Sequence, residues 1–339
     1  MIKQTLALLG LLILISCKKE VSEPQSDFTV FEVPGHFPQP KYKFSGNPIT
    51  EEGFELGRKL FYDPRLSVDG TVSCSSCHAQ VHAFADHGLA LSEGVDGKLG
   101  RRNAPGIYNL AWIPEFMWDG GIHHIELISL APLTDSVEMA HTMEGLLSYL
   151  NSETEYPSEF EAVFGSAEIT SYELLLAITQ FQGAIVSDGS KYDKFLRGEL
   201  QLSADEMQGV ELFNSNCSSC HSGVLQTDFT YRNNGLDLNS SDQGRARITL
   251  RESDVGKFRV PSLRNVKLTK PYMHDGRFPT LQAVLDHYDE GIQPHPNLDP
   301  QLEDGIELSE YEKERIIDFL NTLSDFELLS DRRFSEPIQ

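Results

Sequence analysis

Cys74-Ser-Ser-Cys-His78 and Cys217-Ser-Ser-Cys-His221 are two identical pentads that decide the organisation of this 339-residue chain. Together they use every cysteine of the chain except Cys17. Pairs of cysteines at this spacing also occur in zinc sites and in the disulfide frameworks of exported proteins. Tetrahedral zinc does not require a histidine directly after each pair, however, and a chain of this length does not need disulfides in order to fold.

The histidine that ends each pentad indicates covalent haem attachment. In a Cys-x-x-Cys-His sequence the two thiols form thioethers with one haem, and the adjacent imidazole becomes a ligand of its iron. We therefore predict two covalently bound haem c groups. Their attachment residues are Cys74, Cys77 and His78 for the first and Cys217, Cys220 and His221 for the second.

The first sixteen residues have the pattern of a lipoprotein signal peptide. Lys3 supplies a positive start, residues 6–15 are apolar, and Leu14-Ile-Ser-Cys17 has the form of a lipidation signal. An apolar run of about ten residues is too short to span a bilayer. We expect a lipidated Cys17 on the periplasmic side of a bacterial membrane, inner or outer, followed by a tether that extends to residue 44.

The formal charge of −23 excludes a broad nucleic-acid-binding face and leaves the lipid anchor as the only expected membrane contact. It favours a basic protein partner, because opposite charges speed association. Solubility alone is an equally good explanation of this charge.

Helical periodicity dominates the rest of the chain, with helices predicted at residues 50–60, 142–150, 171–185, 203–213 and 309–323. Gly57-Arg-Lys-Leu-Phe61 and Gly209-Val-Glu-Leu-Phe213 precede the two pentads and form a degenerate repeat. The fold class is therefore mainly α, with two cytochrome c-like helical domains in a pseudo-repeat and one haem in each. We place these domains at residues 45–195 and 196–325, followed by a tail at 326–339.

Three further segments carry a resemblance to a known family. They are residues 94–105, Met117-Trp-Asp-Gly120 with Pro132 and Glu138-Met139, and residues 259–276. From about residue 45 to about residue 325 the chain resembles the bacterial di-haem cytochrome c peroxidases, which include MauG-like members that oxidise a protein substrate.

The resemblance implies a cytochrome-c peroxidase. Hydrogen peroxide would be reduced to water at the N-terminal haem, and electrons from a small donor protein, a c-type cytochrome or a cupredoxin, would enter at the C-terminal haem. MauG-like oxidation of a protein or organic substrate and plain electron transfer without catalysis are the alternatives. The resemblance also leaves a homodimer open.

The resemblance assigns roles to particular residues. Glu138 would be the acid-base group that moves protons during peroxide cleavage, and Trp118 would relay electrons between the haems. A calcium ion would be held by Asn103 and by the backbone carbonyls of Thr269 and Pro271, which are hard oxygen ligands. His274 would form hydrogen bonds at the domain interface and would not ligate iron.

Two departures from the standard peroxidases concern the iron ligands. Val95 stands where those enzymes have a capping histidine, so the N-terminal haem would have an open face at rest, unless His82 or His87 supplies the ligand. Tyr288 stands where most peroxidases have a methionine ligand to the C-terminal haem, as in the MauG-like branch. Met273 and His287 are the competing ligands.

A third departure makes the N-terminal haem pocket less polar than usual. Ile128 stands where a glutamine is common, and Gly121 replaces an arginine. His123 or His124 could compensate for the lost polarity.

Overall fold

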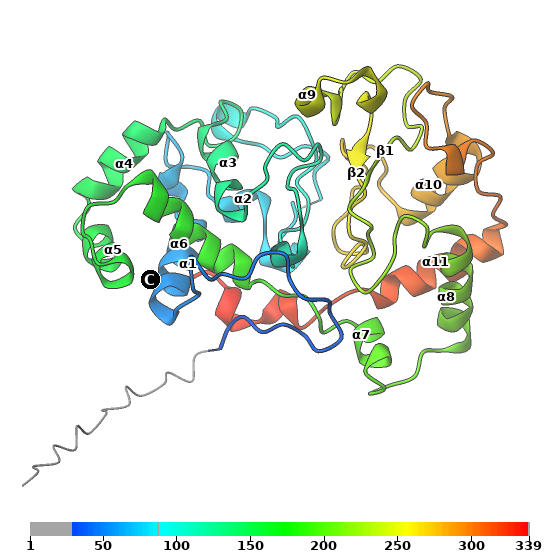
Figure 1. Ribbon diagram of the computed structural model, residues 1–339, viewed down its shortest axis with the longest axis horizontal. Helices are drawn as coiled ribbons and strands as arrows, with labels where there is room; N and C mark the ends of the chain where they lie inside the picture. The colour runs from blue at the N-terminus through cyan, green and yellow to red at the C-terminus, as the bar shows by residue number, and fades with distance from the viewer. Residues whose placement is uncertain (1–28, 87, 338–339) are drawn as a thin grey trace, which may run out of the picture.

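A helix leads into each pentad, as the repeated Gly-x-x-Leu-Phe pattern predicts. The structure is a computed structural model that describes residues 29–86 and 88–337 and is mainly helical (Figure 1). In it, α1 (Glu51–Tyr62) precedes α2 (Cys74–Cys77), and α8 (Ala204–Asn216) ends directly before the second pentad. The predicted signal peptide, Cys17 and His87 lie outside the described residues.

The helices form two lobes that lie side by side along the long axis of the molecule (Figure 1). The first lobe also contains α3 (Leu130–Thr134), α4 (Met143–Ser152), α5 (Tyr156–Phe164) and α6 (Ser171–Ala184). The second contains α7 (Lys191–Leu196), α8, α9 (Ala246–Thr249), α10 (Leu281–Asp286), α11 (Glu310–Thr322) and the antiparallel two-residue strands β1 (Tyr231–Arg232) and β2 (Phe258–Arg259). The five predicted helices are all present, with ends within three residues of the prediction.

The glycine of each repeat marks a close helix crossing. A Cβ atom on Gly57 in α1 would lie 2.1 Å from the backbone oxygen of Ala177 in α6. A Cβ atom on Gly209 in α8 would lie 2.0 Å from the backbone oxygen of Arg315 in α11. No side chain fits at either position. Both halves therefore use a glycine to let the helix before the pentad pack closely against a second helix.

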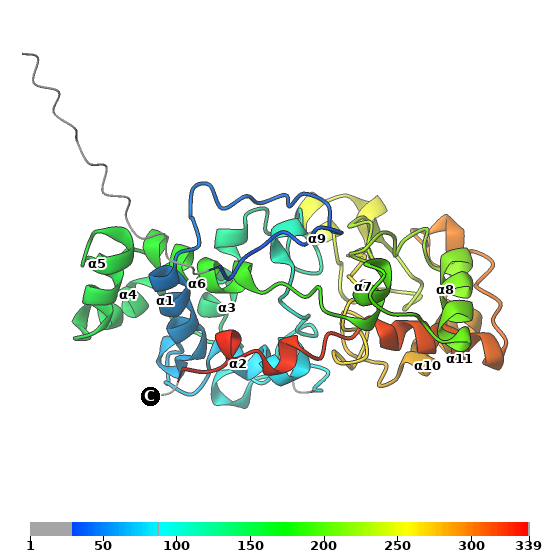
Figure 2. The same ribbon diagram turned by 90° about the horizontal axis from the view of Figure 1, so that it is seen from below.

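Segments at both ends of the chain pack against the first lobe. Phe37 and Phe44 from the N-terminal segment and Phe334 from the C-terminal segment are buried in one core with Phe54 and Phe181. Figure 2 shows the chain after α11 running back beneath the first lobe. Residues that the sequence analysis assigned to a tether and a tail are therefore packed, because their aromatic side chains fill the core of this lobe.

A buried ion pair connects the N-terminal segment to the second lobe. Arg264 and Asp193 form the pair with side chains that are 1% and 0% exposed, and His36 contacts the same carboxylate at 2.9 Å. The guanidinium of Arg264 also lies 5.0 Å from the ring centre of Phe37. Within residues 29–86 and 88–337, no helix is long and apolar enough to cross a membrane.

Candidate functional site

The first pentad forms a short helix whose geometry leaves one histidine nitrogen for a metal. The backbone N–H of Ser73 donates to Ser76 Oγ (3.1 Å), which begins α2, and His78 follows its last turn. The Nδ1–H of His78 donates to the carbonyl of Phe84 (2.9 Å). This bond places the free lone pair on Nε2, and burial lowers the pKa of His78, so the imidazole is neutral and suited to ligate iron.

The second pentad repeats this arrangement. The Nδ1–H of His221 donates to the carbonyl of Gln226 (3.1 Å), and burial again lowers the pKa of the imidazole. Two histidines that sit after identical sequences thus adopt the same tautomer through the same kind of bond. This agreement supports the prediction that both pentads serve the same cofactor.

The alternative uses of the four pentad cysteines do not fit the structure. No disulfide joins these four cysteines. No group of three or more histidine, cysteine, aspartate or glutamate side chains in the described part of the chain could hold a metal ion.

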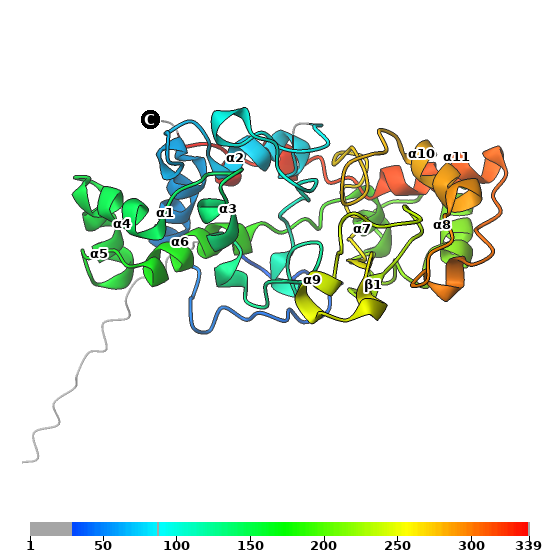
Figure 3. The same ribbon diagram turned by 90° about the horizontal axis from the view of Figure 1, so that it is seen from above.

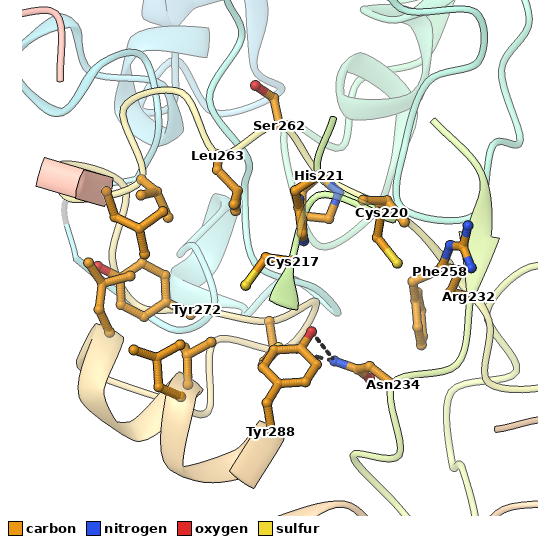
Figure 4. Close-up of a pocket in the computed structure, with 18 of the residues that line it drawn as sticks. Cys217, Cys220, His221, Arg232, Asn234, Phe258, Ser262, Leu263, Tyr272 and Tyr288 are labelled. Atoms are coloured by element: carbon orange, nitrogen blue, oxygen red, sulfur yellow. Dashed lines mark hydrogen bonds between the residues drawn. The ribbon is translucent and has the colours of Figure 1, made fainter. Parts of the chain in front are cut away.

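A large cavity faces the second pentad. It has a volume of about 740 Å³, within the range of ~300–1,000 Å³ typical of cofactor sites. Cys217, Cys220 and His221 line one side, and Tyr288 is directed toward them from the opposite side (Figure 4). The size, the mostly apolar lining and the pair of thiols at its wall fit a haem group.

The structure separates the three residues predicted to compete for the iron in this cavity. Tyr288 lies in a π-helical turn (His287–Gly291) that continues α10, and it lines the cavity together with Met273. His287 is not among the residues that line it. Its Nε2–H donates to the carbonyl of Asn234 (2.9 Å), and its ring packs 5.5 Å from that of Phe278.

Asn234 is a site residue that the sequence analysis missed. Its side-chain N–H group donates to the Tyr288 hydroxyl (3.4 Å) and to Met273 Sδ (3.4 Å) (Figure 4). Burial raises the pKa of Tyr288, whereas the bond from Asn234 lowers it. An asparagine in a polar loop carries no signal that distinguishes it from an ordinary turn residue.

Trp118 belongs to the first lobe but lines the cavity of the second. Its indole N–H donates to the carbonyl of Asn103 (2.8 Å), and its own carbonyl accepts from the backbone N–H of Arg259 (2.8 Å). The backbone N–H of Asn103 in turn donates to the carbonyl of His274 (2.8 Å). Trp118 is thus held between the two lobes, and its role as an electron relay stays a prediction.

The predicted calcium ligands lie close to this junction. Asn103, Thr269 and Pro271 all line the cavity. The side-chain N–H group of Asn103 donates to the carbonyls of Leu89 and Ala90 (3.2 Å each), which leaves its Oδ1 atom as the acceptor on the other side. His274 is buried, and its ring stacks on Phe258 at 3.7 Å.

Ion pairs and hydrogen bonds of two arginines hold the segment around Trp118 in place. Arg102 of the first lobe contacts Asp242 of the second (2.7 Å) and Asp119 of its own lobe (2.7 Å). Arg245 of the second lobe donates to the carbonyls of Asp119 (2.9 Å) and Gly120 (3.0 Å). Arg245 directly precedes α9, and Figure 3 shows α9 at the boundary between the lobes. These charged residues were not singled out from the sequence.

Glu138 lies near the first pentad, because its neighbour Met139 packs in one core with Val72, two residues before Cys74. Burial is the main cause that raises the pKa of the Cys77 thiol to about 11, and the charges of Asp86 and Glu138 add to it. Burial and the nearby Asp135 raise the pKa of Glu138 itself, although Arg101 opposes this rise. A carboxyl group of raised pKa next to a haem-attachment turn is suited to accept and return protons.

Val95 is adjacent to Glu138 and is buried. Its backbone N–H donates to the carbonyl of Glu138 (2.8 Å), and its side chain packs in a core with Leu133 and Met139. It therefore helps to position the glutamate backbone. His82 lies in the short turn that follows the pentad, and whether it reaches the iron stays a prediction.

The residues expected to adjust the polarity of the first haem pocket differ in burial. His123 and His124 are exposed, and His123 Nδ1 lies 3.2 Å from Glu115 Oε1. Gly121 is also exposed, and Ile128 packs against the core of the first lobe. Neither histidine is buried near the pentad, so compensation by these two side chains finds no support in their placement.

The chain matches the family model "Di-haem cytochrome c peroxidase" over residues 51–201. It is 35% identical over 299 residues to the methylamine utilization protein MauG of Methylorubrum extorquens, with coverage of 86% of this chain and 83% of MauG. It is 36% identical over 245 residues to the cytochrome c551 peroxidase of Nitrosomonas europaea, with coverage of 70% and 73%.

A similar solved structure is the crystal structure of a MauG-like protein associated with microbial copper homeostasis. The TM-score is 0.84 at 35% identity, and the match covers 90% of this chain and 98% of that one. These findings define the class of the protein as a mainly helical oxidoreductase. The chain belongs to the di-haem cytochrome c peroxidase and MauG family, and this membership implies two haems.

Proposed function

We propose that this chain reduces hydrogen peroxide at its N-terminal haem with electrons that enter through its C-terminal haem. The reaction consumes one peroxide molecule, two electrons and two protons and forms two water molecules. The observation that carries the proposal is the place of Glu138 in the fold: its neighbour Met139 packs in one core with Val72, two residues before the first pentad, and burial raises the pKa of the Glu138 carboxyl. The family relatives include both peroxidases and MauG proteins, so residues of this chain must decide between them.

Haem iron, when bound, supplies the redox chemistry on which cleavage of the peroxide O–O bond depends. Glu138 would relay a proton between the two peroxide oxygens, and the two protons consumed overall come from solvent. The Glu138 carboxylate takes a proton from one peroxide oxygen and returns it to the departing oxygen, a role typically worth ~10²–10⁴ in rate. The raised pKa of Glu138 lies closer to neutral pH, so the carboxyl can both accept and release a proton there, as an acid-base group must.

Replacement of Glu138 with glutamine tests this role. The expected result is a fall of about 10²–10⁴ in the rate of peroxide consumption by the haem-loaded protein, because glutamine cannot exchange a proton. Glu144→Gln is the matched control, since Glu144 is exposed in α4. An E138Q rate equal to that of the control would overturn the assignment.

The orientation of Tyr288 favours a second candidate, the MauG-like oxidation of a partner protein. Tyr288 faces His221 across the cavity, where a phenolate ligand would stabilise ferric iron and lower its reduction potential. A low potential hinders electron uptake from a high-potential donor and helps to store oxidising equivalents.

Peroxide added to the fully oxidised protein distinguishes the two candidates. A peroxidase of the standard kind would need prior reduction before its spectrum changed. In the MauG-like case, one equivalent of peroxide would change the spectrum directly, and the change would decay faster when an oxidisable protein was present. We expect the direct reaction, because Val95 has no atom that could cap the N-terminal iron.

The calcium ion belongs to the same proposal. Asn103 Oδ1 and the carbonyls of Thr269 and Pro271 are oxygen donors of the kind that calcium prefers. Support comes from the two hydrogen bonds that orient the Asn103 amide group. Metal analysis of the purified protein before and after treatment with a calcium chelator would test it, and an absence of calcium in the untreated protein would refute it.

We further propose an anchor at Cys17 on the periplasmic side of the membrane and a basic donor protein. The support for the anchor is the signal-like sequence, and the support for the donor is the charge of −23. Cys17→Ala should move the protein from the membrane fraction to the soluble fraction. Electron transfer from a basic cytochrome should slow as salt concentration rises, because salt screens the attraction.

A further inference from the structure

Asn234 contacts all three side chains that the sequence offers as the sixth ligand of the C-terminal haem. Its backbone carbonyl accepts the Nε2–H of His287 (2.9 Å). Its side-chain N–H group reaches the Tyr288 hydroxyl and Met273 Sδ, both at 3.4 Å (Figure 4). One residue therefore forms a hydrogen bond with a possible ligand atom of each candidate.

These contacts have unequal effects on the three candidates. The bond from His287 Nε2 uses the nitrogen that would otherwise bind iron, and it holds the ring outside the cavity. The shared amide N–H group acts differently on the other two. A thioether sulfur is a weak acceptor, whereas a hydrogen bond to an ionised oxygen is roughly twice as strong as one between neutral groups. The amide therefore favours the phenolate oxygen of Tyr288 over the sulfur of Met273.

The loop that carries Asn234 is fixed on both sides. The Asn233 side chain accepts the backbone N–H of Gly235 (2.8 Å), and the Gly235 carbonyl accepts the N–H of Gln293 (2.7 Å). The Asn233 carbonyl accepts the N–H of Asp299 (3.0 Å). These bonds join the loop to the segment that follows the π-helical turn, so the amide group is held in place before any ligand binds.

The turn that carries Tyr288 is fixed as well. Its carbonyl accepts the backbone N–H of Ile306 (2.9 Å). The buried ammonium group of Lys313 in α11 contacts Asp286 (2.9 Å) and Asp289 (2.8 Å), on either side of the tyrosine. With both partners held, a small change in the amide is expected to act on the choice of ligand and not on the fold.

We propose that Asn234 is a positioning residue that selects the oxygen of Tyr288, over Met273 and His287, as the ligand of the C-terminal haem iron. This inference rests on the proposed function, which places a haem in this cavity and Tyr288 on its iron. It goes beyond that function because it explains why a chain that presents both a tyrosine and a methionine to the cavity would use the tyrosine.

Asn234→Leu tests the inference, because leucine is similar in size and has no N–H group to donate. The expected result is a change of about 10- to 100-fold in the ratio of tyrosine-ligated to methionine-ligated haem, the effect of losing one hydrogen bond to a charged group. It would be seen as the far-red charge-transfer band of thioether-ligated ferric haem and as a higher reduction potential of that haem. Met273→Leu in the same background should abolish the new band.

Asn234→Asp is the second variant, in case leucine disturbs the loop. It keeps the shape of the side chain, removes the donor and places a carboxylate near the phenolate, so it should shift the ratio in the same direction. Asn239→Leu is the matched control, since Asn239 is exposed in the same polar loop, and its spectrum should equal that of the unaltered protein. An unchanged ratio in both Asn234 variants would overturn the inference.

Tyr288→Phe separates the inference from the proposed function. If this variant leaves the spectrum of the C-terminal haem unchanged, then Tyr288 is not the ligand, and the assignment fails together with the inference. If the Tyr288→Phe spectrum changes while both Asn234 variants keep the parent spectrum, only the inference about Asn234 fails.

Discussion

Gly209→Ala should destabilise the C-terminal half, although alanine is the better helix former. The new Cβ atom would lie 2.0 Å from the carbonyl oxygen of Arg315, whereas ordinary contacts begin near 3.4 Å. Backbone atoms cannot rotate away, so α8 and α11 would have to separate by about 1 Å or more. The same crossing holds the rings of Phe213 and Phe319, whose centres are 4.8 Å apart.

The expected change in the free energy of unfolding follows from two opposing effects. Overpacking of a well-packed contact costs about 1–3 kcal/mol and occasionally more. A gap of about 0.5–1 Å between packed atoms forfeits a quarter to a half of their attraction, which places this site in the upper part of the range. Replacing a helical glycine with alanine recovers about 1 kcal/mol. The net loss is about 2 kcal/mol, equivalent to a fall of about 4–8 °C in the unfolding midpoint of a unit of this size.

Thermal unfolding of the haem-loaded protein, followed by circular dichroism, measures this shift. Gly46→Ala is the matched control, because a Cβ atom on Gly46 meets nothing within 4 Å. That variant should be neutral or slightly more stable, since alanine restricts the unfolded chain. A Gly209→Ala protein as stable as the control would refute the idea that the glycine is needed for the close crossing.

Two further predictions concern pH. Burial and Asp135 raise the pKa of Glu138, so the rate of peroxide consumption should fall as pH drops through a value above 4.5, and this limb should be absent in Glu138→Gln; an identical limb in both proteins would show that another group titrates. Burial alone would raise the pKa of Asp242, but the ion pair with Arg102 lowers it to about 2. The stability contributed by this ion pair is therefore present above the ordinary pKa of 3.8 and is lost as pH falls toward 2. Asp242→Asn should abolish that part of the acid dependence, worth about 2 kcal/mol, and acid unfolding curves that coincide for the two proteins would contradict it.

Much of the fold follows from patterns that are local along the chain. The pentads, the capped helices and the glycine that precedes each pentad are all read within windows of a few residues, and the structure places the helices where those patterns predict. The packing of residues 29–44 was not predicted, because Phe37 and Phe44 lie in a segment without periodicity. Only a core built from distant residues shows that these rings are needed.

The residues of the candidate site also differ in how they could be predicted. His78 and His221 were predicted as ligands because each follows its cysteine pair directly, and their hydrogen bonds to Phe84 and Gln226 involve residues only six and five positions away. Glu138 and Trp118 were predicted from a family resemblance, and the structure adds their surroundings.

The sequence by itself determined where two haems would attach, because covalent attachment depends on residues that are neighbours in the chain. It favoured Tyr288 as ligand of the second iron but left Met273 and His287 as competing candidates, since all three occur within the same stretch. Only the tertiary structure turned Tyr288 and Met273 toward the cavity and His287 away from it. The physical reason is that the choice depends on Asn234, which lies 54 positions before Tyr288 and meets it only when the chain is folded.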